Sequence, residues 1–228
     1  LPWQMLIEKK KIKLKYIPLL DNGELNLKKL KSLISNKTKL ISIVHMSNVI
    51  GTINPIDKII KIAKKYNIPT LIDACQSIVH QPIDIQKIDC DFLVFSGHKM
   101  MGPTGVGVLY MKKLYAKKIE PFQRGGHMIK EVNDFSSTWN DSPWKFEAGT
   151  ANIAQVIGLA SSIKYINRIG LNRIMKYEND LLQYFLSKIK TIKDIKIYGH
   201  TNNKFGPIIS FNIKGCPPYD IAKLLDSY

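Results

Sequence analysis

The sequence predicts an α/β fold with a mostly parallel sheet flanked by helices, followed by the start of a small α+β domain. The first half of the chain carries short, apolar, β-favouring runs separated by segments with helical apolar spacing. Strands that alternate with helices in this way are typical of a buried parallel sheet. The last part of the chain instead shows a helix, two strands and a helix, a different pattern that predicts a second domain.

Each element of the first half is predicted from its apolar period and the turn residues that bound it. The predicted strands cover residues 11–18, 40–45, 69–72, 91–95 and 106–110. The predicted helices cover residues 25–34 and 56–66, and the second has a lysine-rich outer face. Residues 114–144 are expected to be irregular.

The second half is predicted from the return of helical spacing at residue 151. One long helix is expected over 151–169, ending near Gly170, and a second over 172–190. Two strands at 195–198 and 208–213 and a helix over 218–228 complete the pattern. We therefore expect a large domain over residues 1–160, with its N-terminal part missing, and the truncated beginning of a small domain over 161–228.

Composition excludes several classes of protein. The 228 residues carry a net charge of +16, but only three of the basic residues are arginines. A nucleic-acid site favours local arginine clusters with interleaved aromatic residues, so no nucleic-acid partner is expected. No run of about 18 apolar residues occurs, so no membrane span is expected. Three scattered cysteines predict neither a disulfide framework nor a metal site, and they favour a reducing compartment.

Polar side chains follow two of the predicted buried strands. Asp73 ends the strand at 69–72, and Ser96, His98 and Lys99 follow the strand at 91–95. Open α/β sheets bind ligands outside the carboxyl ends of their strands. Pyridoxal phosphate needs a lysine for covalent attachment, an acid for its ring nitrogen and donors for its phosphate. These four residues meet that list.

Four ordered motifs carry a resemblance to a known family. They read HMSNVIGTINP from residue 45, LIDACQS from 71, CDFLVFSGHKMMGPTGVGVLY from 90 and PWKFEAGTANIAQVIGL from 143. The chain resembles, from residue 2 to residue 228, the group II cysteine desulfurases of the SUF iron–sulfur system. These are class V aminotransferase-like enzymes of fold-type I that use pyridoxal 5'-phosphate.

The resemblance implies a role for each matching residue. Lys99 is expected to bind the cofactor covalently and to move the substrate's Cα proton, while Asp73 keeps the ring nitrogen protonated. Gln76 is expected to bond the ring's phenolic oxygen, or only to cap a turn. Ser96 and His98 are expected to bind the phosphate.

Two further residues are implied at the edge of the site. Asn48 is expected on the substrate side of the ring. His45, three residues earlier, is interpreted as a structural residue. Thr150 is expected to reach the phosphate of a neighbouring subunit, which implies a homodimer. The alternative for Thr150 is an N-cap of the following helix.

The resemblance also implies an activity. The expected reaction removes sulfur from L-cysteine, giving L-alanine and an enzyme persulfide for iron–sulfur cluster assembly through a SUF-type acceptor protein. A soluble protein of the bacterial cytoplasm or a plastid-type organelle is implied. The alternatives are a selenocysteine lyase or another class V enzyme, an inactive cofactor-binding remnant and, remotely, a basic RNA-binding module.

Departures from the family pattern lead us to expect an internal fragment. The family's nucleophilic cysteine lies in a loop that would follow Tyr228, and its ring-stacking histidine would precede Leu1. Arg124 occupies a position at which the family's glycine-rich loop usually has another glycine. Cys75, Cys90 and Cys216 lack the histidine-rich, glycine-rich context of that loop, so none of them is expected to be the nucleophile.

Overall fold

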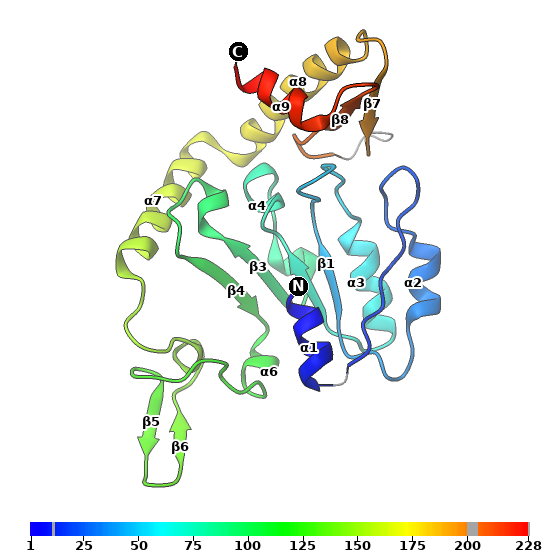
Figure 1. Ribbon diagram of the computed structural model, residues 1–228. Helices are drawn as coiled ribbons and strands as arrows, with labels where there is room; N and C mark the ends of the chain where they lie inside the picture. The colour runs from blue at the N-terminus through cyan, green and yellow to red at the C-terminus, as the bar shows by residue number, and fades with distance from the viewer. Residues whose placement is uncertain (11, 200–204, 228) are drawn as a thin grey trace.

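The computed structural model describes residues 1–10, 12–199 and 205–227, and its central feature is a four-stranded sheet. The strand order is β1-β2-β3-β4, with β1 to β3 parallel and β4 antiparallel to β3 (Figure 1). Their bounds are Ile41–Val44, Thr70–Asp73, Phe92–Ser96 and Gly107–Met111. Four of the five strands predicted in the first half of the chain are therefore present, each within about two residues of its expected bounds.

Helix α3 (Ile56–Lys65) covers one face of this sheet because its apolar residues fall on one side. Ile56, Ile59, Ile60 and Ala63 recur at helical spacing, are buried, and join the core that includes Ile72 of β2. Each fully buried isoleucine side chain contributes about 1.5–3 kcal/mol to folding. The short helices α4 (Ser77–His80) and α5 (Ile85–Ile88), which the sequence did not predict, connect β2 to β3.

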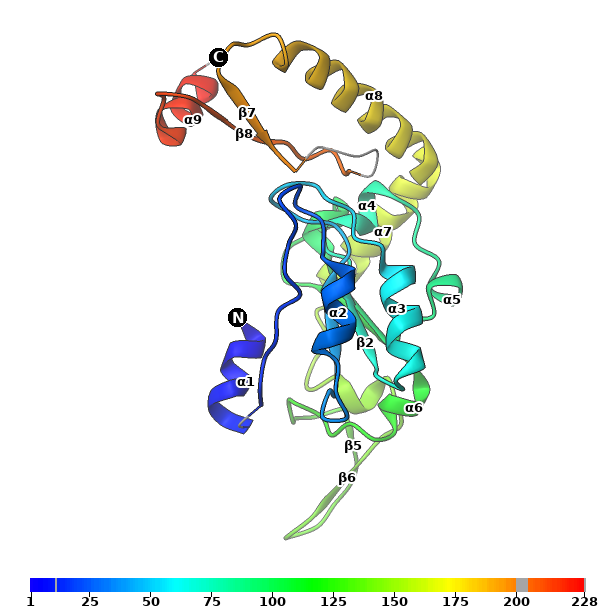
Figure 2. The same ribbon diagram turned by 90° about the vertical axis from the view of Figure 1, so that its right-hand side faces the viewer.

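The N-terminal segment differs from the prediction. Residues 2–10 form helix α1 (Pro2–Lys10), which Figure 2 shows set apart from α2 (Leu27–Leu33). The strand predicted over 11–18 is wrong for residues 12–18, which form no strand, while Lys11 lies outside the described residues. Apolar alternation alone does not make a strand, because a strand also needs a neighbour to complete its hydrogen-bond ladder.

The stretch predicted to be irregular is partly ordered. It contains β5 (Ile129–Val132) and β6 (Ser137–Trp139) and overlaps α6 (Lys113–Ala116) and η2 (Trp144–Phe146) at its two ends. Strands β5 and β6 form an antiparallel hairpin that extends away from the sheet in both views. All four residues of β5 are exposed, so no buried face gave the hairpin a clear sequence signal.

Two long helices lead from the sheet to the C-terminal elements. Helix α7 (Ile153–Ile169) packs Leu159 and Ile166 against Met100, and α8 (Leu171–Ile189) follows after Gly170, whose φ of 91° turns the chain. The last half of α8 packs instead on the hairpin of β7 (Ile195–Tyr198) and β8 (Ser210–Ile213), forming a separate core.

Helix α9 (Pro218–Asp226) completes the chain as described; the predicted helix extended to residue 228, which lies outside the described residues. We call the described part of residues 195–226 the small C-terminal unit. Figure 1 shows it over one edge of the main sheet. No helix in the described part of the chain is long and apolar enough to span a bilayer.

Candidate active site

The carboxyl ends of β1, β2 and β3 meet at one edge of the sheet, because these strands are parallel. The residues that directly follow them are a turn at 45–54, the segment Asp73 to Gln76, and the 3-10 helix η1 (Gly97–Met100). The sequence-predicted site residues Asn48, Asp73, Gln76, His98 and Lys99 lie on these segments, and Ser96 is the last residue of β3. Ligands bind open α/β sheets at this edge.

Asp73 and Ser96 lie on the same face of the sheet. Asp73 is in register with Val94, and Ser96 lies two residues further along β3, so their side chains share a face. The Asp73 Oδ1 atom accepts a hydrogen bond of 2.9 Å from the backbone N–H of Cys75. Burial, followed by the Asp73 carboxylate, raises the pKa of the Cys75 thiol, and Ser96 acts on it in the opposite direction. The Cys75 side chain therefore lies beside both predicted residues.

The Ser96 hydroxyl is the most informative polar group at this edge. Its Oγ atom is buried and has no hydrogen-bond partner among the described residues. A buried hydroxyl without a partner costs free energy, so native proteins usually satisfy such groups. An oxygen-rich ligand at this position would accept the missing hydrogen bond.

The turn that carries His98 and Lys99 depends on close backbone packing. Gly97 is buried against Val106, and a Cβ atom at position 97 would lie 2.7 Å from the Val106 side chain. Met100 anchors the other end of the turn in the core with α7. His98 is exposed and Lys99 is half-buried, so both side chains remain accessible at the edge of the sheet.

Three predicted residues occupy the periphery of this region. Gln76 stands at the N-cap position of α4, but its side chain makes no capping hydrogen bond. Asn48 is exposed in the turn after β1. Thr150 is also exposed, and the alternative that it caps α7 is wrong because Asn152 is the N-cap residue. The described contacts of this single chain do not bring Thr150 to Asp73 or Ser96.

His45 is separated from the site by the sheet itself. Val44 is in register with Asp73, so the next side chain, His45, points to the opposite face. There it is buried and its Nε2 atom lies 3.1 Å from the Gln81 amide, a contact that local sequence patterns did not predict. Burial lowers the pKa of His45 to about 4, although the Asp57 carboxylate opposes this effect. These features fit the structural reading of His45.

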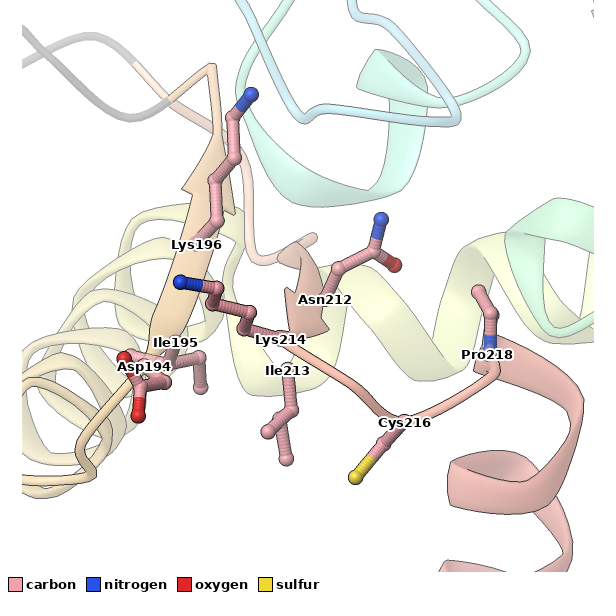
Figure 3. A pocket seen from close by; sticks show the side chains of 8 residues that line it. All are labelled: Asp194, Ile195, Lys196, Asn212, Ile213, Lys214, Cys216 and Pro218. Carbon is pink, nitrogen blue, oxygen red and sulfur yellow. The ribbon is translucent and has the colours of Figure 1, made fainter.

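The three cysteines occupy distinct environments. Cys90 is buried, and burial raises the pKa of its thiol to about 11. Cys216 is exposed and lines an open pocket of the small C-terminal unit together with Lys196, Asn212 and Lys214 (Figure 3). That pocket contains none of the predicted site residues. No group of three or more His, Cys, Asp or Glu side chains across the described ranges is placed to hold a metal ion.

The sequence of the chain is similar to known proteins over its whole length. The profile of the aminotransferase class-V family matches residues 1–228. A cysteine desulfurase from Wigglesworthia glossinidia brevipalpis is 53% identical over 229 residues, covering 100% of this chain and 55% of the relative. One from Shigella sonnei is 42% identical over 228 residues, covering 100% of this chain and 56% of the relative. The chain thus spans about half the length of these curated relatives.

Solved structures of cysteine desulfurases superpose on nearly the whole chain. The apo structure of a cysteine desulfurase from Thermococcus onnurineus superposes with a TM-score of 0.94 at 38% identity, covering 99% of this chain and 56% of that one. The Escherichia coli cysteine desulfurase CsdA superposes with a TM-score of 0.93 at 30% identity, covering 100% of this chain and 56% of that one. The predicted fold-type I α/β class is therefore confirmed.

Proposed function

The chain belongs to the class V aminotransferase family, and from that membership we propose that the protein carrying it is a cysteine desulfurase that converts L-cysteine to L-alanine. The family and these relatives are pyridoxal-phosphate enzymes, so pyridoxal 5'-phosphate is the cofactor. Relatives that bear this activity in their names match the whole chain, and the choice of L-cysteine rests on them.

The observation that carries the cofactor site is the Ser96 hydroxyl, which has no hydrogen-bond partner among the described residues and lies on the sheet face that also holds Asp73. A phosphate group is an acceptor for such a buried donor, and a carboxylate at the end of the neighbouring strand suits a protonated ring nitrogen. The residues present therefore fit pyridoxal phosphate. Ser96 and His98 would hold the phosphate, Gln76 the phenolic oxygen and Lys99 the aldehyde carbon.

Bound pyridoxal phosphate supplies an electron sink for bonds broken at the substrate's Cα atom. Asp73 would hold the proton on the ring nitrogen, which keeps that sink effective. The Lys99 amine would remove the Cα proton and return it to the product. Asn48, in the turn after β1, would orient the amino acid.

Sulfur transfer requires a thiolate. The thiolate attacks the substrate sulfur, and an S–S bond forms as the Cβ–S bond breaks. The electron pair of the broken bond stays with Cβ, which takes up a proton to become the methyl group of alanine. The sulfur remains on the attacking cysteine as a persulfide, so no external oxidant is needed. Cys75 and Cys90 are poor candidates because burial raises the pKa of both thiols and keeps them protonated at neutral pH. Cys216 lines a pocket that contains none of the predicted site residues, so we propose that the attacking cysteine lies outside residues 1–228.

We also propose the subgroup of the enzyme, its sulfur acceptor and its assembly. The four motifs favour the group II, SUF-type desulfurases, which would pass sulfur to an acceptor protein for iron–sulfur cluster assembly. Thr150 is exposed and has no contact with its own subunit's Asp73 or Ser96, which suits a role in the site of a second subunit. A homodimer in the bacterial cytoplasm is the assembly that we propose.

The test measures alanine and sulfide released from L-cysteine in the presence of a thiol reductant. The full-length protein should turn over, whereas its Lys99→Ala variant and residues 1–228 alone should not. Borohydride reduction should place the pyridoxyl group on Lys99. L-Selenocysteine as the only productive substrate would favour a selenocysteine lyase, and turnover by residues 1–228 alone would show that one of the three cysteines here is the nucleophile.

A further inference from the structure

The turn that carries Asn48 is bonded to the small C-terminal unit. The Gly206 N–H donates to the Gly51 carbonyl over 2.8 Å, and the Ser210 hydroxyl donates to the Val49 carbonyl. Thr52 and Phe205 form an isolated antiparallel bridge beside these bonds. We call this set of contacts the Gly51–Gly206 seam. It joins residues on both sides of Gly51 to a single strand-like segment of the small unit.

Both glycines are required for this approach of two backbones. Gly51 has a φ of 68°, and a Cβ atom there would lie 2.7 Å from the Ile208 carbonyl oxygen and 3.0 Å from that of Gly206. A Cβ atom at Gly206 would overlap the Met46 thioether, and Met46 is only 1% exposed. Neither position has room for a larger residue, because the obstacles are backbone in one case and a fully buried side chain in the other.

Four hydrogen bonds within the turn involve Ser47. The Ser47 N–H donates to the Thr52 carbonyl at 3.0 Å, and the Gly51 N–H donates to the Ser47 carbonyl at 3.2 Å. The Val49 and Ile50 N–H groups both donate to the Ser47 hydroxyl at 3.2 Å. Asn48 itself is exposed at the outer part of this turn. The seam adds two hydrogen bonds from the small unit to the same six residues, so the small unit contributes to holding the turn in place alongside the turn's own bonds.

A second contact joins α8, the helix that leads into the small unit, to α4. The His80 Nδ1 atom lies 2.9 Å from both carboxylate oxygens of Glu178, which joins α4 to α8. This junction lies near the N-terminal half of α8 and touches no residue of the Asn48 turn. It therefore provides a way to disturb the connection between the two parts without altering the seam.

We propose that the Gly51–Gly206 seam positions Asn48, so that the small C-terminal unit sets the geometry of the substrate side of the site. Gly51 and Gly206 are positioning residues in this arrangement, and they act through the turn rather than on the substrate. The proposal rests on the proposed function only where it assigns Asn48 to the substrate. The mechanical coupling of the turn to the small unit stands independently of any activity.

The coupling is tested by amide hydrogen exchange on the full-length protein. Gly51→Ala should raise exchange about tenfold or more in residues 47–52 and 205–210 together. Gly215→Ala is the matched control, because Gly215 has a φ of 79° but nothing lies within 4 Å of the place that a Cβ atom would take, so it shares the backbone strain without the contact. Glu178→Gln disturbs only the second junction, and both controls should leave residues 47–52 protected.

Steady-state kinetics tests the consequence for Asn48. Gly51→Ala should raise KM for L-cysteine about tenfold while the absorbance of the bound cofactor is unchanged, and Asn48→Ala should do the same. Combining them should add little, because both remove one interaction. Unchanged exchange in residues 47–52, an equal effect of Glu178→Gln, or additive KM effects would overturn the proposal. A full-length protein without turnover would contradict the proposed function, while the exchange measurement would still decide the coupling.

Discussion

Replacing Ser96 by alanine should affect cofactor binding and protein stability in opposite directions. The Ser96 Oγ atom is buried without a hydrogen-bond partner among the described residues, so the cofactor-free protein has no bond to lose. Ser96 is close enough to the Cys75 thiol to act on its pKa, but by distance and angle Ser96 Oγ has no hydrogen-bond partner among the described residues. The free energy of unfolding of the cofactor-free protein should stay constant or rise by about 1 kcal/mol, because the cost of the unpaired hydroxyl is removed.

The cofactor-bound protein should respond in the other way. A hydrogen bond to a charged phosphate contributes about 1.5–3 kcal/mol, so its loss should weaken cofactor binding about 10- to 100-fold. Ser77 is the matched control. It is fully buried, but its hydroxyl donates to the Ala74 carbonyl at 3.3 Å. Ser77→Ala should therefore lower the free energy of unfolding by about 1 kcal/mol and leave cofactor affinity unchanged.

Two measurements on the full-length protein show whether Ser96 binds the cofactor. Urea unfolding of the cofactor-free forms gives the stabilities, and equilibrium dialysis against pyridoxal phosphate gives the affinities. If Ser96→Ala destabilised the cofactor-free protein by more than about 1 kcal/mol and bound the cofactor as tightly as the parent, Ser96 would be a structural serine like Ser77.

Two further outcomes follow from the site and its surroundings. Asp73→Asn keeps the side-chain shape but not the charge that holds the ring-nitrogen proton, so NMR should show Cα-proton exchange of a bound amino acid slowed about 100-fold or more; exchange at the parent rate would mean that another acid serves the ring. The pKa of His45 is about 4 in the folded protein against 6.5 for a free histidine, so the unfolded state binds a proton first as the pH falls. This group should lower the free energy of unfolding by about 3 kcal/mol between pH 6.5 and 4, and urea unfolding of His45→Gln should lack that component. An identical acid response in the parent and the variant would contradict the burial of a neutral imidazole.

Local sequence patterns predicted the elements that build the sheet edge. The helical spacing of Ile56, Ile59, Ile60 and Ala63 identified α3 because an amphipathic helix repeats its buried residues regardless of what it packs against. The spacing of Asp73 and Lys99 after two apolar runs identified the candidate site for a similar reason. Asp73 ends β2 and Lys99 lies in the 3-10 helix that follows β3, so their placement at one edge needed only the parallel order of those strands. The roles of these residues and the domain boundary after residue 160 remain predictions.

Contacts between distant segments were decided by the tertiary structure alone. Residues 12–18 have an alternating pattern but form no strand, because pairing depends on a neighbour that the pattern does not specify. The bond between His80 and Glu178, the lack of a partner for Ser96 Oγ among the described residues and the meeting of Gly51 with Gly206 likewise had no local signal. A glycine in a sequence indicates only that the backbone is free to turn there. Which other backbone occupies the space left by its missing side chain is fixed only when the whole chain has packed.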